Sequence, residues 1–253
     1  MRPKNILVLL LIGLTLSSCK QSYLQLSVMT YNVRHCSGMD YVVDYDRTAG
    51  VIAKQQPDIV ALQELDSVTG RSEHHDQLAE LACRTGYYPV FGRAIDYDEG
   101  CYGVGILSRE CPISSQCIPL PGEEPRVLLV VEFKDYVIAC THLDLEKEAR
   151  LASVPLIVEE SRRWEKPFIL AGDWNDTPSS ALLKEMKKDY TILSGDSPTY
   201  PADTPEECID FIAIFNNHPA KVMDYHVIDE PEASDHRPIM LKVLLRVTMS
   251  LVS

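Results

Sequence analysis

Two hydrophobic patterns alternate along the 253-residue chain. Short apolar runs bounded by Gly, Pro or Asp predict strands, and longer stretches with apolar residues every three or four positions predict helices. Helices are expected at 46–56, 76–84, 146–163 and 179–188. Strands are expected at 26–33, 58–65, 86–92, 102–108, 126–133, 136–143, 167–175, 209–215, 221–227 and from Pro238 onward.

Two prolines affect these helices. Pro57 ends the first helix, and Pro155 is expected to kink the third or split it in two, because proline lacks a backbone donor. Strands dominate and several are consecutive, which favours mixed sheets covered by helices over a doubly wound parallel sheet. With no internal repeat or linker, residues 26–247 are expected to form one domain that acts as a monomer.

The N-terminus has the pattern of a signal peptide. Arg2 and Lys4 precede an apolar run at 5–16 that is short for a bilayer span, and small residues follow it. The segment LSSC resembles the bacterial lipobox, which implies a signal peptide at 1–18, lipidation of Cys19 and a tether at 19–25. It also implies anchoring in the bacterial cell envelope, on the periplasmic side or the cell surface. The alternative is an ordinary membrane anchor or a buried helix.

The chain is acidic. Its formal net charge is −13, and removing Arg2 and Lys4 with the signal peptide lowers it by two, to −15. Nonspecific nucleic-acid binding relies on Lys and Arg that neutralise phosphates, so nucleic acid is disfavoured as a partner. A phosphate substrate is compatible with this charge, because a cation held by carboxylates reverses the local potential.

The cysteines leave disulfide pairing open. Seven follow Cys19, and an odd number cannot all pair internally. Cys101, Cys111 and Cys117 are close enough in sequence to be disulfide candidates, whereas Cys140 lies in the apolar run VIAC and is expected to be a buried thiol. No CxxC pair is present, which disfavours a zinc or redox centre.

Polar residues recur where the predicted strands begin or end. Taken singly, each has an ordinary explanation as a turn former or a solvated residue. Together they would meet at one rim of a folded sheet, which is how many α/β sites are assembled. The residues in question are Asn32, Glu64, His142, Asp144, Asp173, Asn175, Asp210, Asp235 and His236.

Seven motifs resemble the endonuclease/exonuclease/phosphatase superfamily, which includes nucleases, inositol polyphosphate phosphatases and neutral sphingomyelinases. The resemblance runs from about Leu26 to Leu245. It implies an α/β (α+β) fold, a four-layer sandwich of two mixed, mainly antiparallel sheets flanked by helices. The motifs are MTYNV, DIVALQE, GVGILSR, THLD, AGDWND, IDFI and SDHRP.

The resemblance also implies roles for single residues. Glu64 and Asn32, with Asp235 close by, match positions that hold a divalent metal, and oxygen ligands suit Mg²⁺ or Mn²⁺. These three residues are therefore the expected metal site.

The catalytic residues are implied in the same way. Asp173 matches the position that orients or deprotonates the attacking water, and Asn175 the one that contacts the phosphate. Asp210 matches a carboxylate that pairs with His236 and favours its protonated form, and His142 matches a second imidazole at the phosphate.

Four further residues are weaker candidates for substrate binding. Asp144 is expected to brace His142, and Tyr102 lies where some relatives present a tyrosine to phosphate. Arg34 replaces a carboxylate that is frequent in nuclease branches and could clamp a second phosphate or head group, as could Arg71. The alternative for each arginine is a surface ion pair.

The leading hypothesis is an extracytoplasmic Mg²⁺- or Mn²⁺-dependent hydrolase of phosphoric esters. Its substrate would be a phosphodiester or phosphomonoester of a small molecule or a lipid head group, and its contact with the membrane would be through Cys19. A secreted metal-dependent nuclease is the enzymatic alternative. A non-catalytic ligand-binding lipoprotein is disfavoured, because a degenerate copy would usually have lost some of these residues.

Overall fold

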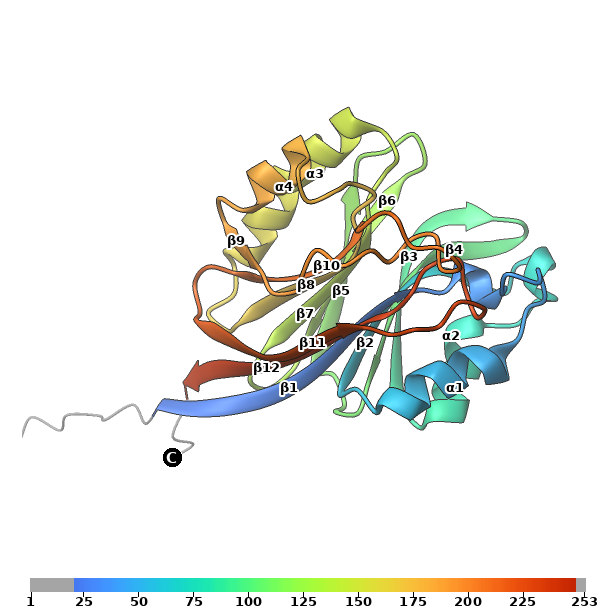
Figure 1. The fold of residues 1–253 in the computed structure, drawn as a ribbon, viewed down its shortest axis with the longest axis horizontal. Coiled ribbons are helices and arrows are strands. Elements are labelled where there is room, and N and C mark those ends of the chain that lie inside the picture. The colour runs from blue at the N-terminus through green and yellow to red at the C-terminus, as the bar shows by residue number, and fades with distance from the viewer. Residues whose placement is uncertain (1–20, 249–253) are drawn as a thin grey trace, which may run out of the picture.

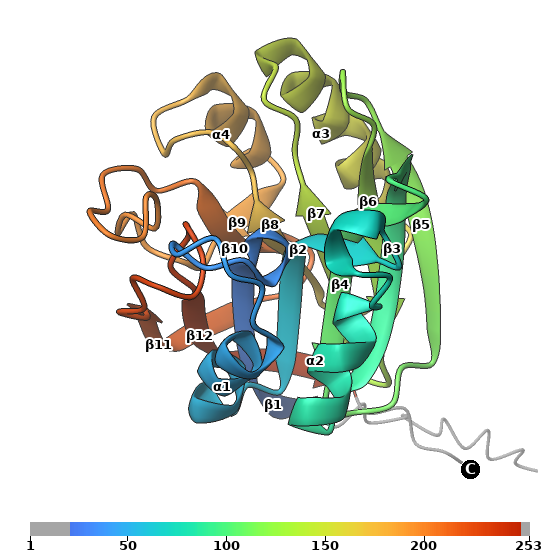
Figure 2. The ribbon, with the colours of Figure 1, turned by 90° about the vertical axis from the view of Figure 1, so that its right-hand side faces the viewer.

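Two six-stranded sheets face each other in a computed structural model that describes residues 21–248. The expected signal peptide and Cys19 lie outside the described residues. Within 21–248, no helix is both long and apolar enough to span a bilayer. Helices cover the outer face of each sheet, which confirms the predicted four-layer sandwich (Figures 1 and 2).

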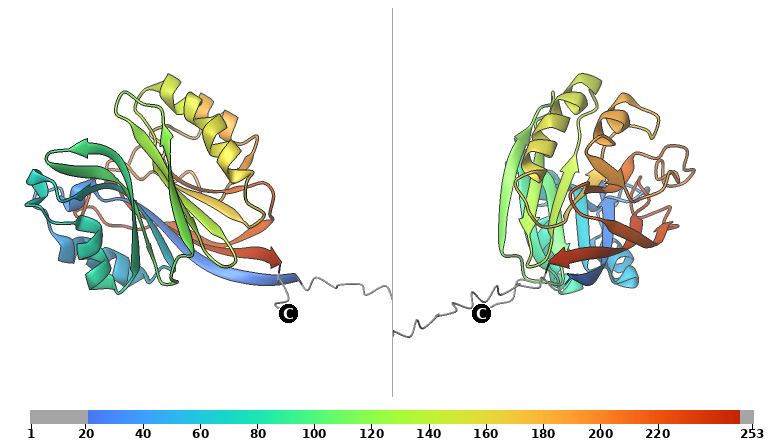
Figure 3. Two further views of the ribbon diagram at one scale, coloured as in Figure 1. Left: turned by 180° about the vertical axis from the view of Figure 1, so that it is seen from behind. Right: turned by 90° about the vertical axis from the view of Figure 1, so that its left-hand side faces the viewer.

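The first sheet has the order β11-β12-β1-β2-β4-β3. Its only parallel pair among the described strands is β1 with β2. β1 begins at Gln21, opposite Thr248, so residues 21–25 extend a strand rather than a tether, because β12 pairs with their backbone (Figure 3). The strands are β1 (Gln21–Asn32), β2 (Ile59–Ser67), β3 (Tyr88–Tyr97), β4 (Gly100–Ser108), β11 (Ala220–Val227) and β12 (Ile239–Thr248).

The second sheet has the order β5-β6-β7-β8-β10-β9. Here β7 and β8 are parallel, and the other neighbouring strands are antiparallel. β5 and β9 were not predicted, because β5 is a largely exposed edge strand with a mixed pattern and β9 has three residues. The strands are β5 (Ser114–Leu120), β6 (Arg126–Glu132), β7 (Val137–His142), β8 (Phe168–Asp173), β9 (Tyr190–Ile192) and β10 (Asp210–Phe215).

Four α-helices form the outer layers. α1 (Tyr45–Gln55) and α2 (Gln77–Thr85) cover the first sheet, and α3 (Lys147–Ser161) and α4 (Ala181–Met186) cover the second (Figure 1). The side chain of Asp44 caps α1 by accepting from the Arg47 N–H. Single turns of 3₁₀ helix, η1 (Arg34–Cys36) and η2 (Gly70–Ser72), complete the set.

The sequence predicted that Pro155 would either kink helix α3 or split it in two. The split does not occur. The helix continues through Pro155 to Ser161. Pro155 is exposed on the outer face, while Val154 and Ile157 are buried against the second sheet. Burial of this inner face stabilises the helix on both sides of the proline.

The core has three parts, one between each pair of neighbouring layers. Val28 and Ile106 meet Leu129 between the sheets. Ile52 of α1 packs in the cluster beneath the first sheet, and Ile157 of α3 in the cluster above the second. Because both faces of each central strand are buried, the strands are nearly continuous apolar runs, and polar groups there are concentrated at strand ends.

All cysteines between residues 21 and 248 are free thiols. The disulfide candidates Cys101 and Cys117 lie on β4 and β5, which belong to different sheets. Cys140 is buried, as predicted, and burial raises the pKa of its thiol to about 12.

Candidate active site

The predicted polar residues meet at one edge of the sandwich. The parallel pairs β1–β2 and β7–β8 end there, with Asn32 next to Gln63 and His142 next to Asp173. β10 runs in the opposite direction and begins at this edge, which sets Asp210 beside Asp173. The strand pairing within each sheet thus brings together residues that are far apart in the sequence.

Unusual backbone conformations aim two of these side chains. Glu64 has φ of 58° at a bulge, where the pairing of β2 with β4 shifts register between Leu62 and Leu65. Asn175 has φ of 51° just after β8. Such left-handed conformations are costly for residues other than glycine and occur preferentially at functional sites.

A pocket of about 480 Å³ opens at this edge. It is lined by seven of the predicted residues, and Asn32 and Asp210 lie buried behind it. Its volume falls in the range of small-molecule sites. The predicted residues in its lining are Glu64, Tyr102, His142, Asp173, Asn175, Asp235 and His236.

Asn32 joins the carboxylates of the two sheets. Its Nδ2 donates to Glu64 Oε1 at 2.9 Å and to Asp173 Oδ2 at 3.1 Å, and its Oδ1 accepts from the Arg34 N–H at 3.1 Å. A flipped amide would lose all three hydrogen bonds. In this orientation Asn32 positions Glu64 and Asp173. Its Oδ1 accepts one hydrogen bond and keeps a second lone pair, so the ligand role expected for Asn32 stays a prediction.

His236 is held by a buried carboxylate, as the sequence predicted. Its Nδ1–H donates to Asp210 Oδ2 at 2.9 Å, and the Thr199 hydroxyl donates to the same oxygen at 2.6 Å. Burial alone would lower the pKa of His236, but the charges of Asp210 and Asp173 outweigh it and raise this pKa to about 10. His236 is therefore an imidazolium at neutral pH.

His142 is in the opposite state. Burial lowers its pKa to about 4, and the charge of Arg126 acts in the same direction against that of Asp173. Nε2 of His142 and Nε2 of His236 each lie 3.6 Å from Asp173 Oδ2. Asp173 thus stands between a neutral and a charged imidazole, and the Asn175 N–H donates to its other oxygen at 2.9 Å.

The donor set of Glu64 and Asp235 fits a divalent cation. Burial raises the pKa of Glu64, and the charges of Asp235 and Asp173 raise it further, while the hydrogen bond from Asn32 lowers it. This crowding of carboxylates is the environment that a hard divalent ion relieves.

A second set of atoms is also close enough to share a metal. The ligand atoms of Asp173, Asp210 and His236 lie within 4.8 Å of one another. However, Nδ1 of His236 already donates to Asp210, and the raised pKa keeps the imidazole protonated. A protonated nitrogen has no lone pair for a metal, so His236 would have to lose a proton to bind one, and Glu64 and Asp235 remain the predicted ligands.

Two of the four weaker candidates, both arginines, lie outside the pocket lining. Arg71 makes a bidentate pair with the buried Asp66, at 2.6 and 2.8 Å, and lies over the ring of Tyr97. Arg34 lies 3.6 Å from Asp235 and over the ring of Tyr41. Arg71 therefore makes an ion pair, which was the alternative to substrate binding. Arg34 lies beside Asp235, the carboxylate that is expected to bind metal.

The remaining two weaker candidates differ. Tyr102 lines the pocket, as expected. Asp144 was expected to brace His142. Instead it accepts from the Glu146 N–H at 2.8 Å and lies 3.7 Å from Nε of Arg126. It therefore reaches His142 only through Arg126, whose guanidinium contacts the imidazole.

Arg126 is a buried pocket residue that the sequence did not reveal. It begins β6, is buried, and lines the pocket with Glu124, Tyr200 and Glu207. In the sequence it is simply the charged residue at the start of RVLLVVEF. The antiparallel pairing of β6 with β7 could have located it, because it sets the start of one strand beside the end of the other.

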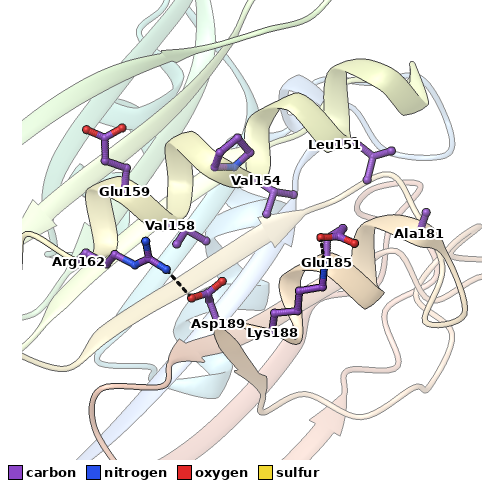
Figure 4. Close-up of a pocket in the computed structure, with 10 residues that line it drawn as sticks. Leu151, Val154, Val158, Glu159, Arg162, Ala181, Glu185, Lys188 and Asp189 are labelled. Atoms are coloured by element: carbon purple, nitrogen blue, oxygen red, sulfur yellow. Dashed lines mark hydrogen bonds and ion pairs between the residues drawn. The ribbon is translucent and has the colours of Figure 1, made fainter.

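A second cavity, of about 730 Å³, lies between α3 and α4 (Figure 4). Val154 and Val158 form part of its floor, and its charged groups include Arg162, which pairs with Asp189 at 3.0 Å. Larger than the first, it holds aliphatic side chains and paired surface charges instead of converging catalytic groups. The pocket at the strand ends is therefore the candidate active site.

Fold and site together define a metal-dependent hydrolase that acts on phosphoric ester bonds. The chain belongs to the Endonuclease/Exonuclease/phosphatase family, whose pattern matches residues 29–236. The match includes the site residues of both sheets, from Asn32 to His236. A search of curated proteins gave no match.

Solved structures share the fold. An endonuclease/exonuclease/phosphatase from Beutenbergia cavernae is 24% identical, with a TM-score of 0.73, over 90% of this chain and 73% of its own. One from Bacteroides vulgatus is 20% identical, with a TM-score of 0.73, over 87% and 98% of the two chains. A mannosyl-6-phosphatase from Bacteroides thetaiotaomicron is 20% identical, with a TM-score of 0.72, over 86% and 99%. At these identities the likeness establishes the fold.

Proposed function

We propose that the protein is an extracytoplasmic, Mg²⁺- or Mn²⁺-dependent phosphoesterase that hydrolyses an ester of a small phosphorylated molecule. The observation behind this proposal is the composition of the pocket. Its lining contains the imidazole of His236 and the amide of Asn175, both of which can donate to a phosphate group. Its lining also includes two acidic side chains, Glu124 and Glu207.

Each inner residue has a role that follows from its contacts. Asp173 accepts the hydrogen bonds that fix it and orients the attacking water. The His236 imidazolium, held by Asp210, and the Asn175 amide stabilise the charge that develops on the phosphoryl oxygens. Glu64 and Asp235 would hold a divalent cation, which would supply Lewis-acid stabilisation of the same charge.

The acidic lining favours a substrate with one phosphate and an uncharged, hydroxyl-rich remainder. Glu124 is paired with Arg126 at 2.9 Å, so Glu207 would supply most of the repulsion against the flanking phosphates of a nucleic acid. Both carboxylates can accept hydrogen bonds from hydroxyl groups. Tyr200, which is partly exposed in the lining, offers an aromatic surface to a ring. The structural neighbour named as a mannosyl-6-phosphatase makes sugar phosphates the first compounds to test.

The proposed location rests on the N-terminal sequence. LSSC with an apolar run before it supports export and lipidation at Cys19, and the surface charge supports a solvent-exposed domain. Globomycin sensitivity of processing and labelling with a fatty acid would establish the lipid, and a Cys19→Ala variant should lose both.

The activity test compares classes of ester. Purified protein is incubated with p-nitrophenyl phosphate, its bis ester, sugar phosphates, phosphatidylinositol phosphate vesicles and plasmid DNA, with Mg²⁺ or Mn²⁺. We expect release of phosphate from sugar phosphates, loss of activity with EDTA, and recovery when the metal is added back. Faster cleavage of vesicle lipid or of DNA would replace the small-molecule proposal with that substrate.

Two variants accompany this test. Asp173→Ala should remove activity on every substrate, because the water is no longer oriented. Asp189→Ala is the matched control: it removes a carboxylate that pairs with Arg162 beside the cavity between α3 and α4. Equal inactivity of wild type and Asp173→Ala on all substrates and with both metals would end the enzyme proposal.

A further inference from the structure

Arg126 is a buried cation beside a buried imidazole. Its side chain is 8% exposed, and Glu124 Oε1 lies 2.9 Å from Nη1. The same Nη1 lies 3.4 Å from Nδ1 of His142, and Asp144 Oδ2 lies 3.7 Å from Nε. One exposed and one buried carboxylate thus flank the guanidinium, which also contacts His142.

The chemistry of this contact fixes the proton on His142. A guanidinium has donors and no acceptor, so Nδ1 of His142 must be the acceptor and have no proton. A neutral imidazole keeps one proton, which then lies on Nε2. Nε2 is the nitrogen that faces Asp173, at 3.6 Å.

We propose that Arg126 is a positioning residue that holds His142 as the neutral Nε2–H tautomer, so that His142 offers a hydrogen bond to the phosphoryl group. The two histidines then differ in kind: His236 is the charged donor held by a carboxylate, and His142 is the neutral donor held by a cation. The catalytic part of this inference rests on the proposed function, whereas the tautomer does not.

The tautomer can be measured directly. Long-range ¹H–¹⁵N correlation spectra of the ¹⁵N-labelled protein at neutral pH report which imidazole nitrogen is protonated, and a His142→Gln variant assigns the signal. We expect an unprotonated Nδ1 and a protonated Nε2 in the wild type. A proton on Nδ1, alone or together with one on Nε2, would overturn the proposal whatever the activity of the protein.

Variants of Arg126 test the cause. Arg126→Met keeps much of the length of the side chain but removes its donors, and should give a mixture of tautomers. Arg126→Lys restores a donor and should restore the wild-type tautomer, because one N–H makes this contact. The control is Arg109→Met, which removes a cation bound to the Pro57 carbonyl. If Arg126→Met has the same spectrum as the wild type, Arg126 does not set the tautomer. If that variant does not fold, the spectrum of the wild-type protein still tests the tautomer assignment.

The kinetic consequence is separate. Arg126→Met should lower kcat by about tenfold, the value of one hydrogen bond in the transition state, with a smaller change in KM. In the His142→Gln background the same change should lower kcat no further. Additive losses would refute the catalytic part. An Nε2–H tautomer in a protein inactive on every ester would refute the proposed function and leave the tautomer assignment intact.

Discussion

Replacing Asp210 with asparagine tests the pairing at the centre of the site. Asp210 Oδ2 accepts from His236 Nδ1 at 2.9 Å and from the Thr199 hydroxyl at 2.6 Å, and all three residues are buried. Asn keeps the shape of the side chain and removes its charge. The fold should therefore persist, while the imidazolium of His236 loses the carboxylate that stabilises it.

The magnitude follows from the kind of hydrogen bond. A bond to a charged group contributes about 1.5–3 kcal/mol, so its loss in the transition state should lower kcat by roughly 10- to 150-fold. His236→Ala removes the donor itself and should cost at least as much. Because Asp210 acts through His236, the double variant should be little slower than His236→Ala alone.

The assay is the initial rate of phosphate release at saturating metal and substrate. Asp189→Asn is the matched control, since it changes a carboxylate outside the site, and circular dichroism checks the fold of each variant. Losses that multiply in the double variant would show that the two residues act independently, and the assignment of the pair would then be wrong.

Three other predictions follow from separate contacts. Glu64→Gln should leave the fold intact and raise the metal concentration needed for half-maximal rate; a wild-type titration would mean that Glu64 is not a ligand. Arg71→Met should lower the free energy of unfolding in urea by about 2 kcal/mol with kcat retained, because Asp66 is left buried and unpaired while Arg71 itself is 34% exposed. Gly172→Ala should destabilise strongly in the same assay, since φ is 156° and the new Cβ would meet the Thr141 carbonyl oxygen; an unchanged midpoint would contradict this.

The order of strands and helices could be predicted where local patterns are strong. The apolar runs that end in Glu64, His142 and Asp173 are buried on both faces, and their predicted ends agree with the structure to within a few residues. β5 could not be predicted, because this edge strand is exposed over its first four residues and does not alternate between apolar and polar positions.

The site was predictable only as a set of residue types. Asp210 and His236 could be paired from the motifs, but the partner of Arg71 depends on which buried carboxylate lies beneath it, and that is a property of the packed sheet. Arg126 was missed for the same reason: its contact with His142 arises from pairing of β6 with β7 and leaves no local signal.

The hydrogen bond from Asn32 to Asp173 joins one sheet to the other, since Asn32 ends β1 and Asp173 ends β8. A relative slide of about 1 Å would break it, because hydrogen bonds weaken steeply beyond about 3.2 Å. Neither sheet alone contains a complete catalytic set, so turnover begins only when both have docked in the right register. The enzyme's own activity is therefore a measure of the final packing step of folding. A substitution in the apolar layer between the sheets, such as Leu129→Ala, should slow catalysis at a distance while both sheets remain formed.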